Sequence, residues 1–106
     1  MRERAIESYY KQQVAAAGGF TRKLLGRIND PDQLTIWPRY RKSRRDPLGL
    51  RAAYSADIHF VEIKAPGERP RPGQLREHSR LQCLGCTVVV LDTKALVDAY
   101  VKAWRS

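Results

Sequence analysis

The sequence predicts a small α/β domain in which a mixed sheet is flanked by helices. Its 106 residues suffice for one domain and leave little room for a second, and 42% of them are hydrophobic, enough for one core. Helical and strand patterns follow one another in the order α-β-β-β-α-β-α, which is typical of helices packed on a sheet. We expect residues 1–106 to form this single domain, with a basic insertion at about 38–56.

The first half of the chain predicts one helix and two strands. Apolar residues recur at three-to-four spacing over residues 3–17, and a glycine pair then ends the helix. Residues 20–25 form a short strand pattern. After turn-forming residues, positions 32–37 alternate as a strand does, and the irregular basic segment begins at Pro38.

The second half adds two strands and two helices. Residues 58–65 carry the strongest strand pattern of the chain, and the proline-rich segment 66–73 predicts a loop. A helix follows over 74–84, a buried strand over 87–91, and a last helix over 93–104 with Leu96, Tyr100 and Trp104 in one stripe.

The charge balance indicates a polyanionic partner. Lys and Arg number 20 against 11 Asp and Glu, which gives a net charge of +9 and a pI near 10.1. Charge alone leaves nucleic acid and an anionic membrane surface open. No apolar run approaches the roughly 18 residues of a membrane span, and the first residues lack the apolar core of a signal peptide. We therefore expect no membrane insertion and a cytoplasmic location, in a viral or bacterial setting.

The two cysteines do not predict a metal or redox site. Cys83 and Cys86 supply two thiols, whereas a structural zinc site needs four ligands. A redox-active pair with this spacing normally opens a helix, and here Gly85 instead predicts a helix end. We expect ordinary buried cysteines.

One face of the 58–65 strand changes character along its length. Side chains alternate in a strand, so Ile58, Phe60, Glu62 and Lys64 share a face. The two large apolar residues predict that this face lies in the core. It nevertheless ends in a carboxylate and an ammonium group.

The 32–37 strand mirrors that pattern, with Asp32 at its start. Antiparallel pairing of the two strands in a register that sets Ile36 opposite Ile58 also sets Asp32 opposite Glu62. Cross-strand neighbours have Cβ atoms about 4.5–5.5 Å apart. The sequence thus predicts two acids and a lysine clustered at one end of an apolar face.

Such a cluster suits a divalent cation. Two close carboxylates repel each other unless a cation lies between them, and carboxylate, carbonyl and water oxygens are the ligands of Mg²⁺ and Mn²⁺. The backbone carbonyl of Ile63 lies between the acid and the lysine. Lys64 can position or deprotonate a water and offset charge on a phosphate. The simpler interpretation is an ion pair of Glu62 and Lys64 at a sheet end.

These residues carry a resemblance to a known family. Pro31-Asp32 followed by Glu62-Ile63-Lys64 looks like the PD-(D/E)xK signature of restriction-endonuclease-like nucleases. Further matches narrow the resemblance to the virus-type replication-repair nuclease (VRR-NUC) domain: Glu7, Ala17-Gly18-Gly19, Lys23, Phe60-Val-Glu-Ile-Lys-Ala-Pro-Gly67, Gln74, His78, Leu81, Gly85 and Val88-Val-Val. The similarity covers nearly the whole chain. The departure is an insertion of about twenty residues between Trp37 and Ile58, where the family has a short hairpin.

The resemblance implies a PD-(D/E)xK fold and a metal centre. In it, Asp32, Glu62 and the carbonyl of Ile63 hold Mg²⁺ or Mn²⁺, and Lys64 is the catalytic lysine. Glu7 matches the acidic position of the first helix, where it reaches the metal through water.

Two of these assignments have simpler alternatives. Glu7 also suits a helical ion pair with Lys11 at i,i+4. Gln74 matches the glutamine that opens the following helix, from which its amide would hold a water or a phosphate oxygen near the site. Its alternative is an exposed first-turn side chain.

Basic residues around the predicted site are candidates for phosphate contact. The candidates are Lys23, Arg39, Arg41, Lys42, Arg44, Arg45, Arg69 and Arg71. Trp37 and Tyr40 lie near the residues from Arg39 to Arg45, and basic residues interleaved with aromatics suit phosphate contact and base stacking. A solvated loop is the alternative for the insertion.

Together these observations predict an Mg²⁺- or Mn²⁺-dependent DNA endonuclease. The resemblance implies a homodimer that cuts branched DNA, such as four-way junctions or flaps. The alternative is a DNA-binding module that keeps the fold and does not cleave.

Overall fold

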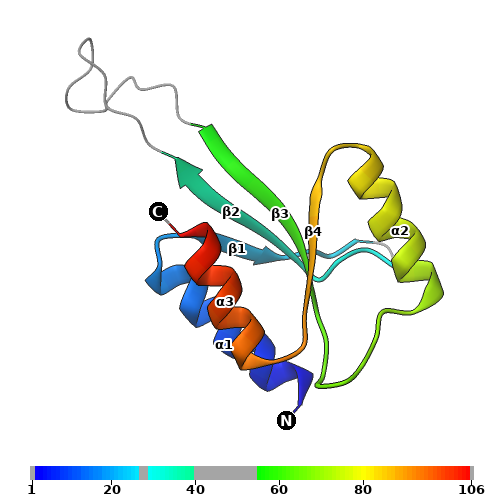
Figure 1. Ribbon diagram of the computed structural model, residues 1–106, viewed down its shortest axis with the longest axis horizontal. Coiled ribbons are helices and arrows are strands. Elements are labelled where there is room, and N and C mark those ends of the chain that lie inside the picture. Colours follow the sequence, from blue (N-terminus) through cyan, green and yellow to red (C-terminus); the bar gives the residue numbers. More distant parts are fainter. Residues whose placement is uncertain (1, 27–28, 40–54, 106) are drawn as a thin grey trace.

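A computed structural model describes residues 2–26, 29–39 and 55–105. Its elements are α1 (Glu3–Ala16), β1 (Phe20–Lys23), β2 (Gln33–Arg39), β3 (Ser55–Ile63), α2 (Pro72–Cys83), β4 (Thr87–Leu91) and α3 (Lys94–Trp104). The sheet has the order β1-β2-β3-β4, with antiparallel pairing among the first three strands and parallel pairing of β4 with β3 (Figure 1). The predicted α/β architecture and element order are confirmed.

Two element boundaries differ from prediction because of proline. Strand β2 continues through Pro38, which pairs with Ala56 of β3. On its other side β1 reaches only as far as Ile36, so Pro38 faces no second strand and its missing N–H breaks no ladder bond. Helix α2 begins at Pro72 rather than Gln74, since a first helical turn tolerates proline.

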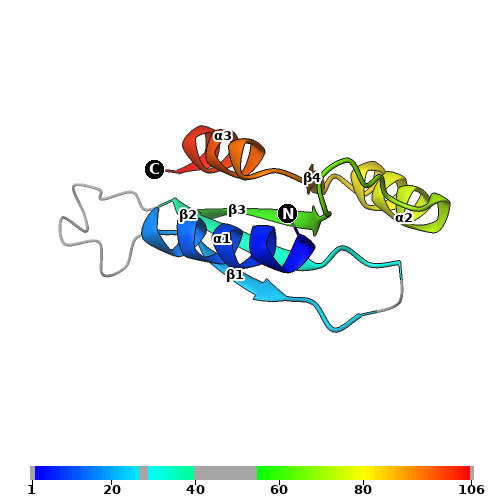
Figure 2. The same ribbon diagram turned by 90° about the horizontal axis from the view of Figure 1, so that it is seen from below.

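The core lies between one sheet face and a layer made of α1 and α3. These two helices run side by side, while α2 lies apart from them beside β4 (Figures 1 and 2). The fully or nearly buried apolar side chains of the helices are Ile6, Tyr10 and Val14 from α1 and Val97, Tyr100 and Val101 from α3. They pack against Trp37, Val61 and Ile63 of the sheet.

The core side of the sheet also carries polar residues, and the helices satisfy them. The Tyr10 hydroxyl lies 2.5 Å from Oγ1 of Thr35. The Tyr100 hydroxyl accepts from Trp37 Nε1 at 2.9 Å and lies 2.6 Å from Nδ1 of His59. Burial lowers the pKa of His59, which favours a neutral ring in this contact. Within the described ranges, every buried side-chain nitrogen and oxygen has a partner.

The predicted strand register is confirmed, but the predicted core face is wrong. Ile36 pairs with Ile58 and Leu34 with Phe60. These even-numbered side chains lie on the face opposite α1 and α3, and Ile58 is 52% exposed. Helices α1 and α3 dock on the odd-numbered face, and α2 lies over the part of the other face near Glu62, where its Leu81 also lines a hollow with Phe60.

Two smaller predictions are wrong in whole or in part. Leu96 is 46% exposed, whereas the other two residues of the predicted stripe face the core: Tyr100 is 6% exposed, and Trp104 packs against the core beside Val97 and Val101. Cys83 is exposed at the end of α2 and Cys86 is half-buried. No helix in the described part of the chain is long and apolar enough to cross a membrane.

Candidate active site

The predicted acids and lysine meet at one end of the sheet. Gln33 pairs with Val61, so Asp32, just before β2, lies across from Glu62 on β3. Asp32 is held on both sides: its Oδ2 accepts from the Ile63 backbone N–H at 2.9 Å, and its carbonyl accepts from the Leu24 N–H at 2.8 Å. The sheet therefore fixes Asp32 against the strand that carries the second acid.

A pocket of about 440 Å³ opens at this position. Its lining residues are Glu3, Asp30, Asp32, Glu62, Lys64, Glu68, Arg69, Arg71 and Gln74. Five of them are carboxylates and three are cations. The first turns of α1 and α2 and the end of β3 thus surround a polar pocket with an excess of acids.

Glu62 is the buried acid of this set. Its side chain is 1% exposed, and its Oε1 lies 3.4 Å from Nε2 of His78 on α2. Burial, then a hydrogen bond with Asp32 and the charge of Asp32, raise the pKa of Glu62 to about 8, while Lys64 lowers it. Burial and then the Lys64 charge lower the pKa of His78, which favours a neutral ring beside the carboxyl group. Without a cation, Glu62 is therefore mainly protonated at neutral pH.

The donor set at this point fits Mg²⁺ or Mn²⁺. Asp32, Glu62 and the Ile63 carbonyl offer oxygens alone, the ligand type that these ions prefer. In the ranges that the structure describes, no three His, Cys, Asp or Glu side chains are grouped as a metal cage. Mg²⁺ usually keeps several waters and is held by one or two carboxylates plus substrate phosphates, so a full cage is not required.

The structure brings a different acid of α1 to the pocket than the sequence suggested. Glu7 Oε1 accepts from Gln33 Nε2 at 3.1 Å and lies 3.4 Å from Lys11 and 3.9 Å from Lys23. Glu7 does not line the pocket, whereas Glu3 does. Burial and then the Asp32 charge raise the pKa of Glu3. The two acids are four residues apart and therefore lie on the same face of the helix. The sequence predicts this face, but it does not predict which of the two acids reaches the pocket.

Gln74 lies where the resemblance implied. It is 4% exposed, lines the pocket, and its Oε1 accepts from the Arg71 N–H at 2.8 Å at the start of α2. The alternative of an exposed side chain is therefore wrong. Asp30 and Glu68 also line the pocket, and no motif in the sequence marked them.

Comparison with known proteins agrees with this geometry. No protein-family model matches the sequence. The chain is 40% identical over 98 residues to "Putative nuclease p44" of Acyrthosiphon pisum secondary endosymbiont phage 1, a match that covers 91% of this chain and 88% of that protein. It also superposes on a solved VRR-NUC domain with a TM-score of 0.69, at 31% identity and over 96% of each chain. The chain belongs to the VRR-NUC family.

The predicted DNA-contact residues of this VRR-NUC domain fall into three groups. Arg69 and Arg71 line the pocket. Lys23 lies beside Glu7, and Arg39 is bound to Asp57 at 2.8 Å and to the Trp104 carbonyl at 2.6 Å. The remaining candidates lie outside the described residues: Tyr40, Arg41, Lys42, Arg44 and Arg45. Trp37 is 1% exposed in the core, so its predicted role in base stacking is wrong.

The raised pKa of Glu62 predicts a pH-dependent stability in the absence of metal. Glu62 ionises near 8 in the folded VRR-NUC domain and near its ordinary 4.5 when unfolded. The unfolded chain therefore binds fewer protons between these values, and stability falls as pH rises from about 4.5 to about 8. Thermal melting in EDTA should show that the melting temperature of the wild type falls between pH 4.5 and pH 8 relative to that of Glu62→Gln.

That comparison removes one titratable group, Glu62, which lies beside His78. His59 and His78, whose pKa values burial lowers, act in the opposite sense at acid pH in both proteins. Added Mn²⁺ binds the ionised carboxylate, so its stabilising effect on the wild type should increase with pH. Parallel curves for the two proteins would contradict the assigned pKa.

Proposed function

We propose that this VRR-NUC domain hydrolyses DNA phosphodiesters with Mg²⁺ or Mn²⁺. The observation that carries the proposal is the fully buried Glu62 facing Asp32 and Lys64 in an open, acid-lined pocket. Burial of an acid beside a second acid costs stability, and a protein that only binds DNA gains nothing from it. The nuclease name of the phage relative supports the same conclusion.

Each residue at the pocket has its own proposed role. Asp32, Glu62 and the Ile63 carbonyl would hold the cation, and Glu3, in place of Glu7, would reach it through water. A bound cation supplies charge for the phosphate and lowers the pKa of water. Lys64 orients the attacking water and offsets the charge that develops on the phosphate. Gln74, fixed by the Arg71 N–H, presents its amide nitrogen as a donor to a phosphate oxygen.

We further propose branched DNA as the substrate and a homodimer as the active form. Two symmetric sites suit a junction that needs two nicks. The net charge of +9 favours the polyanion, and the phage origin of the relative supports action in the cytoplasm of a bacterial host.

A cleavage assay tests the proposed activity and its metal dependence. Labelled linear, flap and four-way-junction DNA are incubated with the protein and with Mg²⁺, Mn²⁺ or EDTA. We expect cuts in branched DNA with either metal and none with EDTA. Tight binding without cleavage in both metals would instead identify a non-catalytic DNA-binding module.

The uncovered face of the sheet is the proposed dimer surface. Ile58 and Val90 are 52% and 37% exposed on β3 and β4 of this face. Ile58→Lys should convert a dimer to a monomer in analytical ultracentrifugation, because a charge cannot be buried there without a partner. Leu96→Lys is the matched control, since Leu96 is 46% exposed on α3, which packs on the other face. A wild type that sediments as a monomer would contradict the dimer.

A further inference from the structure

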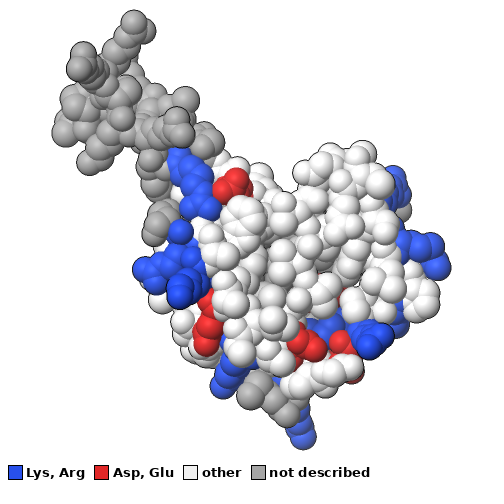
Figure 3. All heavy atoms as spheres, viewed as in Figure 1, with Lys and Arg blue, Asp and Glu red and all other residues white. Residues whose placement is uncertain are grey.

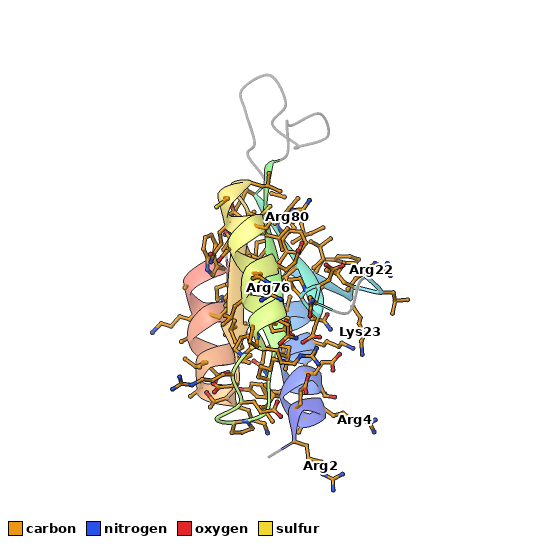
Figure 4. The ribbon with its side chains drawn as sticks, turned by 90° about the vertical axis from the view of Figure 1, so that its right-hand side faces the viewer. Arg2, Arg4, Arg22, Lys23, Arg76 and Arg80 are labelled. Atoms are coloured by element: carbon orange, nitrogen blue, oxygen red, sulfur yellow. The ribbon has the colours of Figure 1, made fainter. Side chains whose placement is uncertain are left out.

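Basic side chains gather on the side of the molecule that faces the viewer in Figure 4. They come from the start of α1, from β1 and from α2: Arg2, Arg4, Arg22, Lys23, Arg76 and Arg80. On the face seen in Figure 3, by contrast, Lys and Arg lie along the edges and the middle carries few charges. The basic residues are therefore not spread evenly over the surface.

The pocket itself cannot attract DNA by charge. Even with Glu62 protonated, its four other carboxylic acids outnumber its three cations, so without a metal it offers no net attraction to a polyanion. The attraction must come from cations outside the pocket. Two elements border the pocket and can carry such cations, β1 and α2. Asp32 is bonded to Leu24, just after β1, and Gln74 belongs to the first turn of α2.

Helix α2 presents two such cations away from its buried side. Gln74 and His78 face the site, while Arg76 and Arg80 are exposed. Four residues along a helix span about 6 Å, and one DNA strand carries a phosphate about every 3.4 Å of duplex axis, so the two arginines match about two phosphates. Neither arginine forms an ion pair with an acid in the described part of the chain.

Strand β1 presents a third cation on the other border. The Arg22 guanidinium lies 4.8 Å from the centre of the Phe20 ring, a contact that limits its motion while leaving it exposed. No described acid forms an ion pair with Arg22, whereas the neighbouring Lys23 forms an ion pair with Glu7 at 3.9 Å. Arg22 is thus the stronger site for phosphate on this border.

We propose that Arg22 on β1 and Arg76 and Arg80 on α2 bind the DNA backbone on opposite borders of the pocket. The strand to be cut then crosses the pocket mouth between them. This inference rests on the proposed nuclease function and adds the path of the substrate. It places the main phosphate contacts on regular secondary structure, outside the insertion that the sequence favoured.

The test is the salt dependence of binding to a short labelled DNA duplex in EDTA. Removing one cation that neutralises a phosphate lowers the log–log salt slope by about 0.9 on duplex DNA. We expect Arg76→Gln/Arg80→Gln to lower the slope by about two such steps and Arg22→Gln by about one, with the decreases adding when the changes are combined. All three residues are exposed, so circular dichroism should show an unchanged fold.

Lys102→Gln/Arg105→Gln is the matched control, with the same change in charge at the end of α3 (Figure 1). Its slope should equal that of the wild type. An α2 variant with the control's slope would overturn the proposal, as would an Arg22→Gln change that adds nothing to it. If the slopes fall as expected while the wild type cuts no DNA in any metal, the surface stands and the nuclease function fails.

Discussion

Asp32→Asn and Glu62→Gln are expected to abolish DNA cleavage while the domain stays folded. Each change removes a charged ligand while nearly preserving the side-chain shape, and the amide introduced at position 32 keeps an oxygen for the Ile63 N–H. Glu62→Gln should also raise the melting temperature in EDTA at neutral pH, because it removes a buried acid whose pKa is about 8. Cleavage and thermal melting measure the two effects.

Asp57→Asn provides a matched control on the same strand. Asp57 pairs with Arg39 at 2.8 Å and lies outside the pocket lining, so its loss should leave the cleavage rate near that of the wild type. DNA binding by all three variants should stay within a few-fold of the wild type. Near-normal cleavage by Asp32→Asn, with no cleavage by Asp57→Asn, would show that the wrong acid had been assigned.

The cluster of Asp32, Glu62 and Lys64 was predictable because it depends on local rules. Alternation along a strand put Glu62 and Lys64 on one face, and antiparallel register then placed Asp32 beside them. Both follow from neighbouring residues and one pairing. The order of elements likewise follows from hydrophobic periodicity within each segment.

The buried face was not predictable because it depends on where distant helices dock. Even-numbered positions offered Ile58 and Phe60, while the odd-numbered ones offered polar Thr35 and His59. Those polar groups are buried because hydroxyls of α1 and α3 reach them across 25 and 41 residues of sequence. Only tertiary packing supplies these partners, so no local pattern reveals them.

The acid contributed by α1 shows the same limit at finer scale. Glu3 and Glu7 share a helix face, and a four-residue step decides which one reaches the pocket. Gln33, in the core beside β1, holds Glu7 through a hydrogen bond of 3.1 Å. The family resemblance predicted an acid on the first helix. The contact between α1 and Gln33 of β2 determines that this acid is Glu3 rather than Glu7.

Lys64→Ala is expected to lower the cleavage rate by about two orders of magnitude or more. Its backbone N–H bonds the Leu91 carbonyl at 3.0 Å, which fixes the residue just beyond β3 with its side chain in the pocket. The ammonium group is no ligand, so metal affinity should change little. Lys64 lowers the pKa of Glu62, so its removal also changes the protonation of this ligand. Calorimetry of Mn²⁺ binding should therefore be carried out above pH 8, where Glu62 is ionised in the wild type. Abolished Mn²⁺ binding there would show that Lys64 acts on the metal site rather than on the reacting phosphate.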